Sequence, residues 1–380
     1  MKVWPKVALG ELLRRSDESA VLDPAAEYHE VTIKLWGKGV ISRGKVYGSD
    51  VVSVRRVVRA NQLILSKIDA RNGAIGLVPP ELDGAIVSND FPSFDFRNHS
   101  QCNPAFMGWL VRSSPFVELC KAASEGTTNR VRIKEDRFLD QQIALPPLAE
   151  QQAFAARLDA LAAKTQQVEA HLDAAERDAE HLLALRFRDT VANAPLRTMA
   201  EVAPSVRRPV GIDIEARYRE VGARSFGKGL FLKPDFDGAE ATWQKPVWIK
   251  SGDLVLSNIK AWEGAVAVAG AEHDGCIASH RYITCVPEPK QATAGFLAYY
   301  LLSEDGMEKI GAASPGTADR NRTLSLSNLG KIEVPVPPLS AQQSFDHLQA
   351  EVAALKAQHA SLRAANAALL PATLERVFSQ

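Results

Sequence analysis

The chain has 380 residues, of which 46% are hydrophobic, so it is long enough for two or three domains with cores of their own. Its 45 basic and 45 acidic side chains balance, which excludes binding to nucleic acid or anionic lipid through overall charge and leaves only a local patch for that purpose. The four cysteines form neither a CxxC pair nor a zinc spacing. With no apolar leader and no stretch long enough to cross a membrane, the sequence predicts a cytoplasmic protein.

The first half contains strands, then helices, then one long helix. Residues 61–78, "NQLILSKIDARNGAIGLV", alternate apolar and polar side chains around Gly73, which predicts a strand, a turn and a second strand. Residues 105–123 have apolar side chains at helical spacing. From residue 149 to about 191 there is no proline or glycine, and a narrow apolar stripe with 3,4 spacing predicts a long helix that needs a helical partner. The stripe contains Leu158, Leu161, Val168, Leu172 and Leu182.

The second half repeats the first in the same order and at nearly constant spacing. "NQLILSKIDARNGAIGLV" aligns without a gap with "GDLVLSNIKAWEGAVAVA" (residues 252–269), and "LPPLAEQQAF" (145–154) returns as "VPPLSAQQSF" (336–345). A repeat about 191 residues long is far beyond solenoid periods of roughly 20 to 50 residues. We therefore expect two similar domains and an internal pseudo-twofold repeat.

The second proline pair also precedes a helix of about 40 residues, since the apolar side chains follow the same rhythm. Its stripe contains Leu348, Val352, Leu355, Leu362 and Leu369, with His359 and Asn366 as polar interruptions that we interpret as register-setting residues. We expect the two helices to pair as an antiparallel coiled coil. The alternative is that each packs along its own domain as an ordinary amphipathic helix.

This order of domain, PPLxxQQ helix, domain, PPLxxQQ helix resembles the specificity subunit of type I restriction-modification enzymes. The resemblance covers the whole chain, and its most specific elements are the two PPLxxQQ segments, "GTTNRVR" (126–132) with "GTADRNR" (316–322), and the aligned strand pairs. It implies an α+β chain with target recognition domains at 1–145 and 196–336, a central long helix at 146–195 and a C-terminal long helix at 337–380.

The resemblance also implies a function without catalysis in this chain. Each recognition domain would read one half of a split DNA sequence, and the helices would set the spacing and dock two modification subunits. Restriction subunits would join the complex where a nuclease is present. S-adenosylmethionine, ATP and Mg²⁺ would be bound by those partner subunits, and the sequence agrees in having no GxxxxGK[ST] loop, no GxGxxG after a strand and no HExxH helix.

Candidate DNA contacts come from aligned loops. Side chains that differ between the copies are candidates for base reading, because two half-sites usually differ in sequence, whereas matched cations suit phosphates. The first group contains Lys67, Arg71, Asn72, Asn89 and Asp90 against Asn258, Trp262, Glu263, His280 and Arg281. The second contains Lys38, Arg43, Arg130 and Arg132 against Lys228, Lys233, Arg320 and Arg322.

Several of these residues have a second interpretation. The base-reading candidates could be ordinary turn residues, Trp262 could belong to a core, and the paired arginines of 126–132 and 316–322 could fix a loop. The two GKG segments (37–39 and 227–229) lack the spaced glycine and hydroxyl of a nucleotide-binding loop, so we favour a phosphate contact with DNA. The main alternative for the whole chain is a coiled-coil adaptor or scaffold that does not read DNA.

Overall fold

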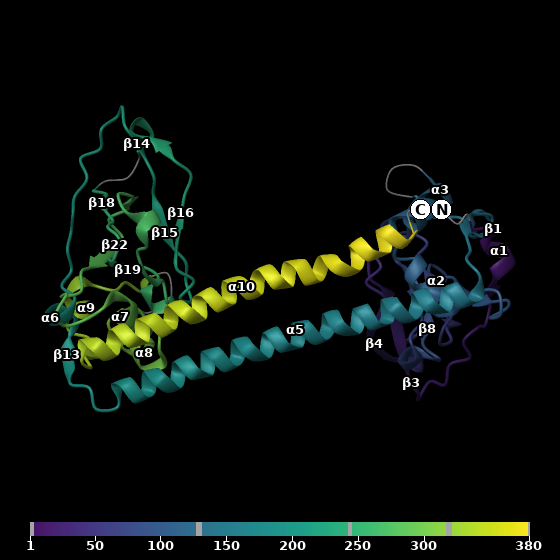
Figure 1. Cartoon of the computed structure of the whole chain (residues 1–380), viewed down its shortest axis with the longest axis horizontal. Coiled ribbons are helices and arrows are strands. Elements are labelled where there is room, and N and C mark those ends of the chain that lie inside the picture. The colour runs from purple at the N-terminus through teal and green to yellow at the C-terminus, as the bar shows by residue number, and fades with distance from the viewer. Residues whose placement is uncertain (1–3, 127–130, 242–244, 317–320, 379–380) are drawn as a thin grey trace. The chain divides into compact units, whose positions relative to one another are not determined.

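The structure is a computed structural model that describes residues 4–126, 131–241, 245–316 and 321–378. The chain forms two compact units. Unit 1 comprises residues 1–172 with 359–380, and unit 2 comprises residues 173–358. Each unit therefore contains one globular domain and parts of both long helices, which Figure 1 shows as α5 in teal and α10 in yellow.

Unit 1 has two four-stranded sheets, with strand orders β2-β9-β6-β7 and β4-β3-β8-β5. Among its described residues, all strand pairs are antiparallel except the single contact of β3 with β8. The strands are β1 (Lys6–Ala8), β2 (Leu13–Ser16), β3 (Glu27–Ile33), β4 (Val40–Tyr47), β5 (Arg56–Val57), β6 (Leu63–Leu65), β7 (Ile75–Leu77), β8 (Ile86–Val87), β9 (Ser93–Phe96), β10 (Ser124–Glu125), β11 (Arg132–Ile133) and β12 (Gln142–Ala144). The helices are α1 (Leu9–Leu12), α2 (Pro104–Leu110), α3 (Ser114–Ala122), α4 (Glu135–Leu139) and the first part of α5 (Leu148–Val191), with short 3-10 turns η1 (Gly48–Asp50), η2 (Ala70–Asn72) and η3 (Pro80–Leu82).

Unit 2 repeats this plan with shorter strands around a three-stranded sheet of order β20-β19-β22. Its strands are β13 (Leu196–Thr198), β14 (Arg217–Tyr218), β15 (Val221–Ala223), β16 (Leu230–Leu232), β17 (Phe236–Asp237), β18 (Val247–Trp248), β19 (Leu254–Ser257), β20 (Val266–Val268), β21 (Ile277–Ala278), β22 (Tyr282–Cys285) and β23 (Glu333–Pro335). Its helices are the second part of α5, α6 (Met199–Val202), α7 (Ala294–Leu301), α8 (Glu304–Ala312), α9 (Leu326–Gly330) and the first half of α10 (Leu339–Phe378), with 3-10 turns η5 (Gly238–Glu240), η6 (Ala261–Glu263) and η7 (Ala271–His273).

The strand, turn and strand predicted around Gly73 and Gly264 are confirmed. β6 pairs with β7, and β19 pairs with β20, both antiparallel. Between the strands, Gly73 and Gly264 adopt φ of 77° and 81°, a left-handed conformation that favours glycine. The predicted helical stretch 105–123 and its counterpart in the second half, 294–312 ("AGFLAYYLLSEDGMEKIGA"), are each interrupted by a corner. At that corner Ser113 and Ser303 precede the second helix, and the Ser303 side chain accepts a hydrogen bond from the Gly306 N–H.

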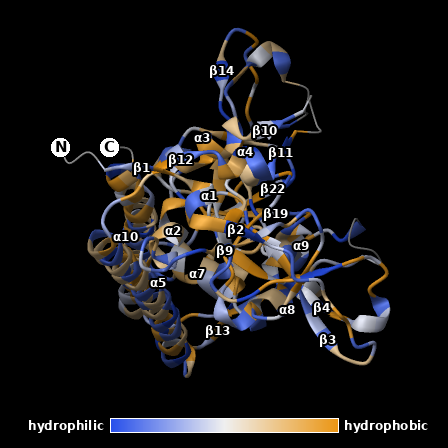
Figure 2. Cartoon of the chain, turned by 90° about the vertical axis from the view of Figure 1, so that its right-hand side faces the viewer, coloured by the Kyte–Doolittle hydropathy of each residue, from blue (hydrophilic) through white to orange (hydrophobic). Residues whose placement is uncertain are grey.

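Each unit has a buried core to which the long helices contribute. In unit 1, Leu158 of α5 and Leu374 of α10 pack in the same cluster as Phe94 and Phe106. In unit 2, Leu183 of α5 and Val352 of α10 pack around Phe296. The long helices therefore pair with each other and also cover their domains, so the two packing modes considered from the sequence occur together. In Figure 2, orange and blue stretches alternate along α5 and α10.

Polar contacts between the helices set an antiparallel register within each unit. In unit 1 the Asn366 side chain donates to the Thr165 carbonyl (3.0 Å) and to Glu169 (2.8 Å), and Arg363 pairs with Glu169 at 2.7 Å. In unit 2, Lys356 pairs with Glu180 at 2.7 Å. Later residues of α10 meet earlier residues of α5, which is the antiparallel direction expected.

Four of the ten predicted seam positions need correction. Leu158, Leu172 and Val352 are buried, and Leu161, Leu348 and Leu355 are partly buried, but four predicted positions are exposed: Val168, Leu182, Leu362 and Leu369. The seam takes the next residue instead, at positions that include Glu169, Leu183, Arg363 and Leu370. Adjacent residues of a helix point about 100° apart, so selecting apolar side chains alone missed the polar residues that pair across the seam.

The four cysteines, Cys102, Cys120, Cys276 and Cys285, are buried and free. Burial raises the pKa of Cys102, Cys120 and Cys285 to about 12, so these thiols stay protonated and unreactive. Within the described ranges, none of the helices has the combination of length and apolar character that crossing a membrane requires.

Candidate nucleic-acid interface

The two glutamines of each PPLxxQQ segment have different roles, which the sequence did not reveal. Gln151 is fully buried, its Nε2 donates to the carbonyls of Pro146 and Gln101 (both 2.8 Å), and its Oε1 accepts the Asn103 N–H (2.8 Å). Gln342 makes the same three bonds in unit 2, to the Pro337 and Gln291 carbonyls (both 2.9 Å) and the Thr293 N–H (3.0 Å). The first glutamine of each pair therefore fastens the helix start and the proline turn to the segment before α2 or α7.

The neighbouring glutamines, Gln152 and Gln343, are exposed. The repeated QQ was the available signal, but one-dimensional spacing could not show which glutamine of the pair is buried. The pinned helix start is a positioning device: it fixes the globular domain relative to the first turns of its long helix, and so orients every loop that the domain carries.

Each GKG segment is held against the turn that follows β6 or β19. The N–H groups of Trp36 and Gly37 donate to the carbonyls of Asn72 and Gly73 (both 3.0 Å). In unit 2, Phe226 and Gly227 donate to Glu263 (2.8 Å) and Gly264 (2.9 Å). Lys38 thereby lies in the loop next to Asn72, and Lys228 in the loop next to Glu263, so the structure brings predicted phosphate and base contacts together in adjacent turns.

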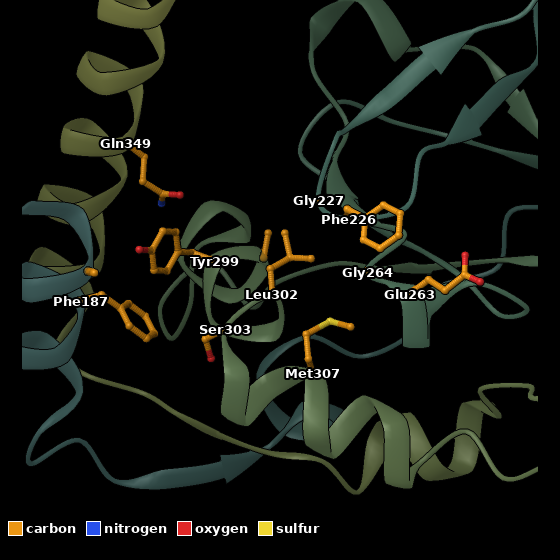
Figure 3. Close-up of a pocket in the computed structure, with 12 residues that line it drawn as sticks. Phe187, Phe226, Gly227, Glu263, Gly264, Tyr299, Leu302, Ser303, Met307 and Gln349 are labelled. Atoms are coloured by element: carbon orange, nitrogen blue, oxygen red, sulfur yellow. The ribbon is translucent and has the colours of Figure 1, made fainter. Parts of the chain in front are cut away.

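The aromatic residue before each GKG has a strained backbone. Trp36 and Phe226 adopt φ of 60° and 62°, which bulky residues seldom do, and both side chains are exposed. Phe226 lines one side of a groove of about 760 Å³ in unit 2, shown in Figure 3. Tyr299 and Leu302 of the α7–α8 corner, with Phe187 of α5, line the other parts. Trp36 has the same place in a groove of about 370 Å³ in unit 1, beside Arg112 and Leu374.

A second cluster of predicted residues lies at the end of β6. The Lys67 N–H donates to the Asp90 carbonyl, and the Lys67 carbonyl accepts the Ile133 N–H (both 2.8 Å). The side chains there form an ion-pair network: Lys67 with Glu135 (2.8 Å), Arg132 with Asp90 (2.8 Å), Arg15 with Glu135 (2.7 Å) and Arg56 with Asp17. Asn89 accepts a hydrogen bond from Arg56 (3.0 Å). We call these residues the strand-end network.

The equivalent place in unit 2 has the same main-chain bonds and different side chains. The Asn258 N–H donates to the Arg281 carbonyl (2.8 Å), and its carbonyl accepts the Leu324 N–H (2.7 Å). Here a cavity of about 300 Å³ opens, lined by Asn258, His280, Tyr282 and other polar residues. The Asn258 Oδ1 is buried and has no hydrogen-bond partner within the described ranges, which costs roughly 1–3 kcal/mol when nothing pairs with it.

The predicted cations divide into paired and unpaired groups. Lys67, Arg132 and Lys233 form ion pairs, the last with Glu220 at 2.9 Å. Within the described part of the chain no ion pair is made by Lys38, Arg43 on β4, Arg71 on η2, Lys228 or Arg281. The unpaired cations are available to phosphates without breaking an internal bond, whereas each paired cation must first exchange its carboxylate.

Arg322 and Trp262 form a structural contact with each other. The Arg322 guanidinium lies 4.7 Å from the Trp262 ring centroid and donates to the Gly311 carbonyl at the end of α8 (3.1 Å). Trp262 is half-buried against the core of unit 2, and its Nε1 donates to the Ile259 carbonyl (3.0 Å). Both were base or phosphate candidates with a structural alternative, and these contacts favour the alternative. Arg130 and Arg320 lie outside the described residues.

The repeat also gains one residue near this point. Ile133 and Leu324 make equivalent bonds and lie 191 residues apart, whereas the aligned Arg132 and Arg322 are 190 apart. This single insertion shifts Arg322 away from the position of Arg132. It explains why Arg132 reaches Asp90 while Arg322 stacks on Trp262.

Two solved structures share this architecture over the whole chain. One, described as the HsdS subunit from Thermoanaerobacter tengcongensis, is 22% identical, with a TM-score of 0.63 and coverage of 100% of this chain and 97% of the other. This chain has the HsdS fold. A second structure with this fold, described in a study of complex assembly and conformational transition of the type I R-M system, is also 22% identical, with a TM-score of 0.68 and coverage of 100% and 98%. The HsdS fold confirms the expected combination of two mixed domains and two long helices. No protein-family model and no curated protein sequence matches the chain.

Proposed function

We propose that this chain is the DNA sequence-specificity subunit of a type I restriction-modification complex. The observation that carries the proposal is the repetition of one domain plan in a chain with the HsdS fold, with conserved main-chain geometry and different side chains in the two copies. Two domains that present the same loops with different side chains suit a target with two different half-sequences. The first domain (residues 1–145) would read one half and the second (196–336) the other.

The unpaired cations beside the GKG loops support contacts to phosphates. Lys38 and Lys228 are exposed at equivalent positions, each beside a tight glycine turn where the backbone can approach DNA closely. Balanced overall charge makes such local cations necessary for DNA binding. The chain itself would be non-catalytic. Modification subunits, two per complex, and restriction subunits where present would hold S-adenosylmethionine, ATP and Mg²⁺.

The deciding experiment is to co-express the chain with its modification subunit and map methylated adenines across the host genome. A host without the chain serves as control. A split motif of two short specified halves around an unspecified gap is the expected result. If the complex co-purifies and no new motif appears, the chain is not a working specificity subunit, and the adaptor alternative gains support.

A DNA-binding measurement distinguishes a specificity subunit from an adaptor that does not read DNA. Reversing both loop lysines, Lys38→Glu with Lys228→Glu, should weaken DNA binding and lower the slope of log affinity against log salt by about two, since each phosphate contact contributes about 0.9. Lys164→Glu on α5 is the matched charge reversal away from these loops. Equal affinity for all three proteins would argue against the loops as DNA contacts.

The ruler role of the helices can be tested by length. Insertion of seven residues after Leu172 in α5 and seven after Gln358 in α10 keeps the heptad seam and adds roughly 10 Å of helix. We expect the unspecified gap to grow by about three base pairs at about 3.4 Å per pair, with both half-sequences unchanged. An altered half-sequence would contradict the ruler role.

A further inference from the structure

In unit 1 the place that corresponds to the cavity of unit 2 holds two charged side chains. There, the residue equivalent to Asn258 is Lys67, and the residue equivalent to Leu326 at the start of α9 is Glu135 at the start of α4. Lys67 and Glu135 form an ion pair that occupies the space. The same fold position is therefore filled by charges in one unit and open in the other.

The open cavity has the size and the chemistry of a small-ligand site. Its volume of about 300 Å³ is at the lower end of the roughly 300–1,000 Å³ of such pockets. The Asn258 amide, Thr323 and Ser325 supply neutral polar groups. Tyr282 supplies an aromatic ring whose position is fixed, because its hydroxyl accepts the Ala223 N–H at 3.2 Å. A flat, uncharged, hydrogen-bonding ligand fits this lining better than an ion does.

Cations lie beside the cavity rather than deep within it. Arg207 lines it with an exposed side chain, and Arg281 is exposed beside His280. Neither arginine makes an ion pair with another residue in the described ranges. A polar recess with free cations at its edge is the arrangement expected where a base enters and its flanking phosphates remain outside.

We propose that this cavity receives one nucleobase that has left the stack of the duplex bound by unit 2. Asn258 pairs with the hydrogen-bonding edge of the base, and Tyr282 contacts its face. In the cavity without a base the Asn258 Oδ1 is shielded from solvent, so the amide turns toward the base as the base enters. It then offers both an acceptor and a donor, the combination that recognises adenine among the bases. Unit 1, with the place filled, reads its half-site without extrusion. This inference rests on the proposed function, since the DNA target comes from the methylation map.

The test uses the complex of the full chain with its modification subunits. DNA duplexes carry 2-aminopurine in turn at each position of the half-site assigned to unit 2, and its fluorescence reports unstacking. We expect a several-fold rise at one position. A mismatch opposite that position should tighten binding about tenfold, because extrusion then no longer breaks a base pair.

Two variants assign the signal to the cavity. Asn258→Lys with Leu326→Glu copies the ion pair of unit 1 and should abolish the fluorescence rise and the preference for the mismatch. Asn258→Leu, of similar size, removes the unpaired acceptor without adding charge and should weaken both. Lys164→Leu on α5, outside the domain loops, is the control and should leave them unchanged. Thermal unfolding and binding of the other half-site verify that each variant folds.

The outcomes separate the two proposals. A split methylation motif with no fluorescent position in that half-site overturns base extrusion and leaves the specificity function standing. A fluorescence rise that persists in the Asn258→Lys, Leu326→Glu protein places the extruded base elsewhere, such as in the modification subunit, and also overturns it. Absence of any split motif contradicts the specificity function itself.

Discussion

The ends of β6 and β19 make the same main-chain hydrogen bonds but carry different side chains, which are charged and paired at β6 and neutral at β19. In unit 1 carboxylates hold Lys67, Arg15 and Arg132, whereas in unit 2 the Asn258 amide stands in an open cavity. The shared backbone bonds fix the loop, so the side chains on it can change without loss of the fold. This difference shows how one domain plan can carry two recognition surfaces.

The largest loss of stability is expected where unit 2 buries a charged side chain and unit 1 has a neutral one. Asp253 is buried in unit 2 and pairs with Arg208 at 2.7 Å, while the equivalent residue of unit 1 is the neutral Gln62, which bonds Ser16 and Asp95. Asp253→Ala leaves the partly buried Arg208 without its carboxylate and should lower the free energy of unfolding of unit 2 by about 3–5 kcal/mol.

Gln62→Ala should cost unit 1 less, about 1–3 kcal/mol, because the carboxylate that loses a donor, Asp95, is partly exposed and keeps its ion pair with Arg14. Hydrogen exchange resolved by peptide measures the two units separately. Equal losses in the two proteins would show that the charge of Asp253 adds nothing to its hydrogen bonds.

The two buried glutamines, Gln151 and Gln342, should stabilise their units equally, because they make equivalent hydrogen bonds. Gln151→Ala and Gln342→Ala each remove three hydrogen bonds from a fully buried side chain and leave carbonyls without donors. Each should lower the stability of its own unit by about 3 kcal/mol, measured by the same exchange method.

The adjacent exposed glutamines provide matched controls. Gln152→Ala and Gln343→Ala should change stability by less than about 0.5 kcal/mol. A large loss of stability from one of the buried glutamines and none from the other would show that equivalent contacts in the two units do not contribute equal stability.

The aligned arginines Arg132 and Arg322 should contribute smaller and unequal amounts to the stability of their units. Arg322→Ala removes a stack on Trp262 and bonds to the end of α8, and should cost unit 2 about 1–2 kcal/mol. Arg132→Ala removes one exposed ion pair with Asp90 and should cost unit 1 less than about 1 kcal/mol. Urea midpoints of the two variants test this order, which reversed values would contradict.

Acid should produce the smallest effect, and one common to both units. A hydrogen bond from Arg59 holds the pKa of Glu18 below 4.5, and one from Arg219 holds the pKa of Asp235 below 3.8. Because each carboxyl pKa is lowered by folding, the stabilisation is present above these values and is lost as the pH falls below them. Both carboxyls are exposed, so Glu18→Gln and Asp235→Asn should have a small effect near neutral pH and none in strong acid. A larger effect in acid than at neutral pH would contradict the assignment.

The local elements could be predicted because they depend on neighbouring residues. Alternation around Gly73 and Gly264 gave the hairpins, since a left-handed glycine and flanking apolar pairs suffice to form one. The 3,4 apolar rhythm after each proline pair gave the long helices, which span 44 and 40 residues, the second with Pro371 inside it. Duplication gave the domain repeat and the correspondence of loops.

Only the tertiary structure decided which of two adjacent residues is buried in a contact. It also decided which side chains occupy the space between distant segments. Val168 or Glu169, and Gln151 or Gln152, are equivalent in spacing, and only contact with the opposite helix or domain selects one. The strand-end network and the cavity likewise depend on side chains from segments far apart in sequence. Periodicity encodes local backbone geometry, whereas these choices are set by the packing of side chains from distant segments.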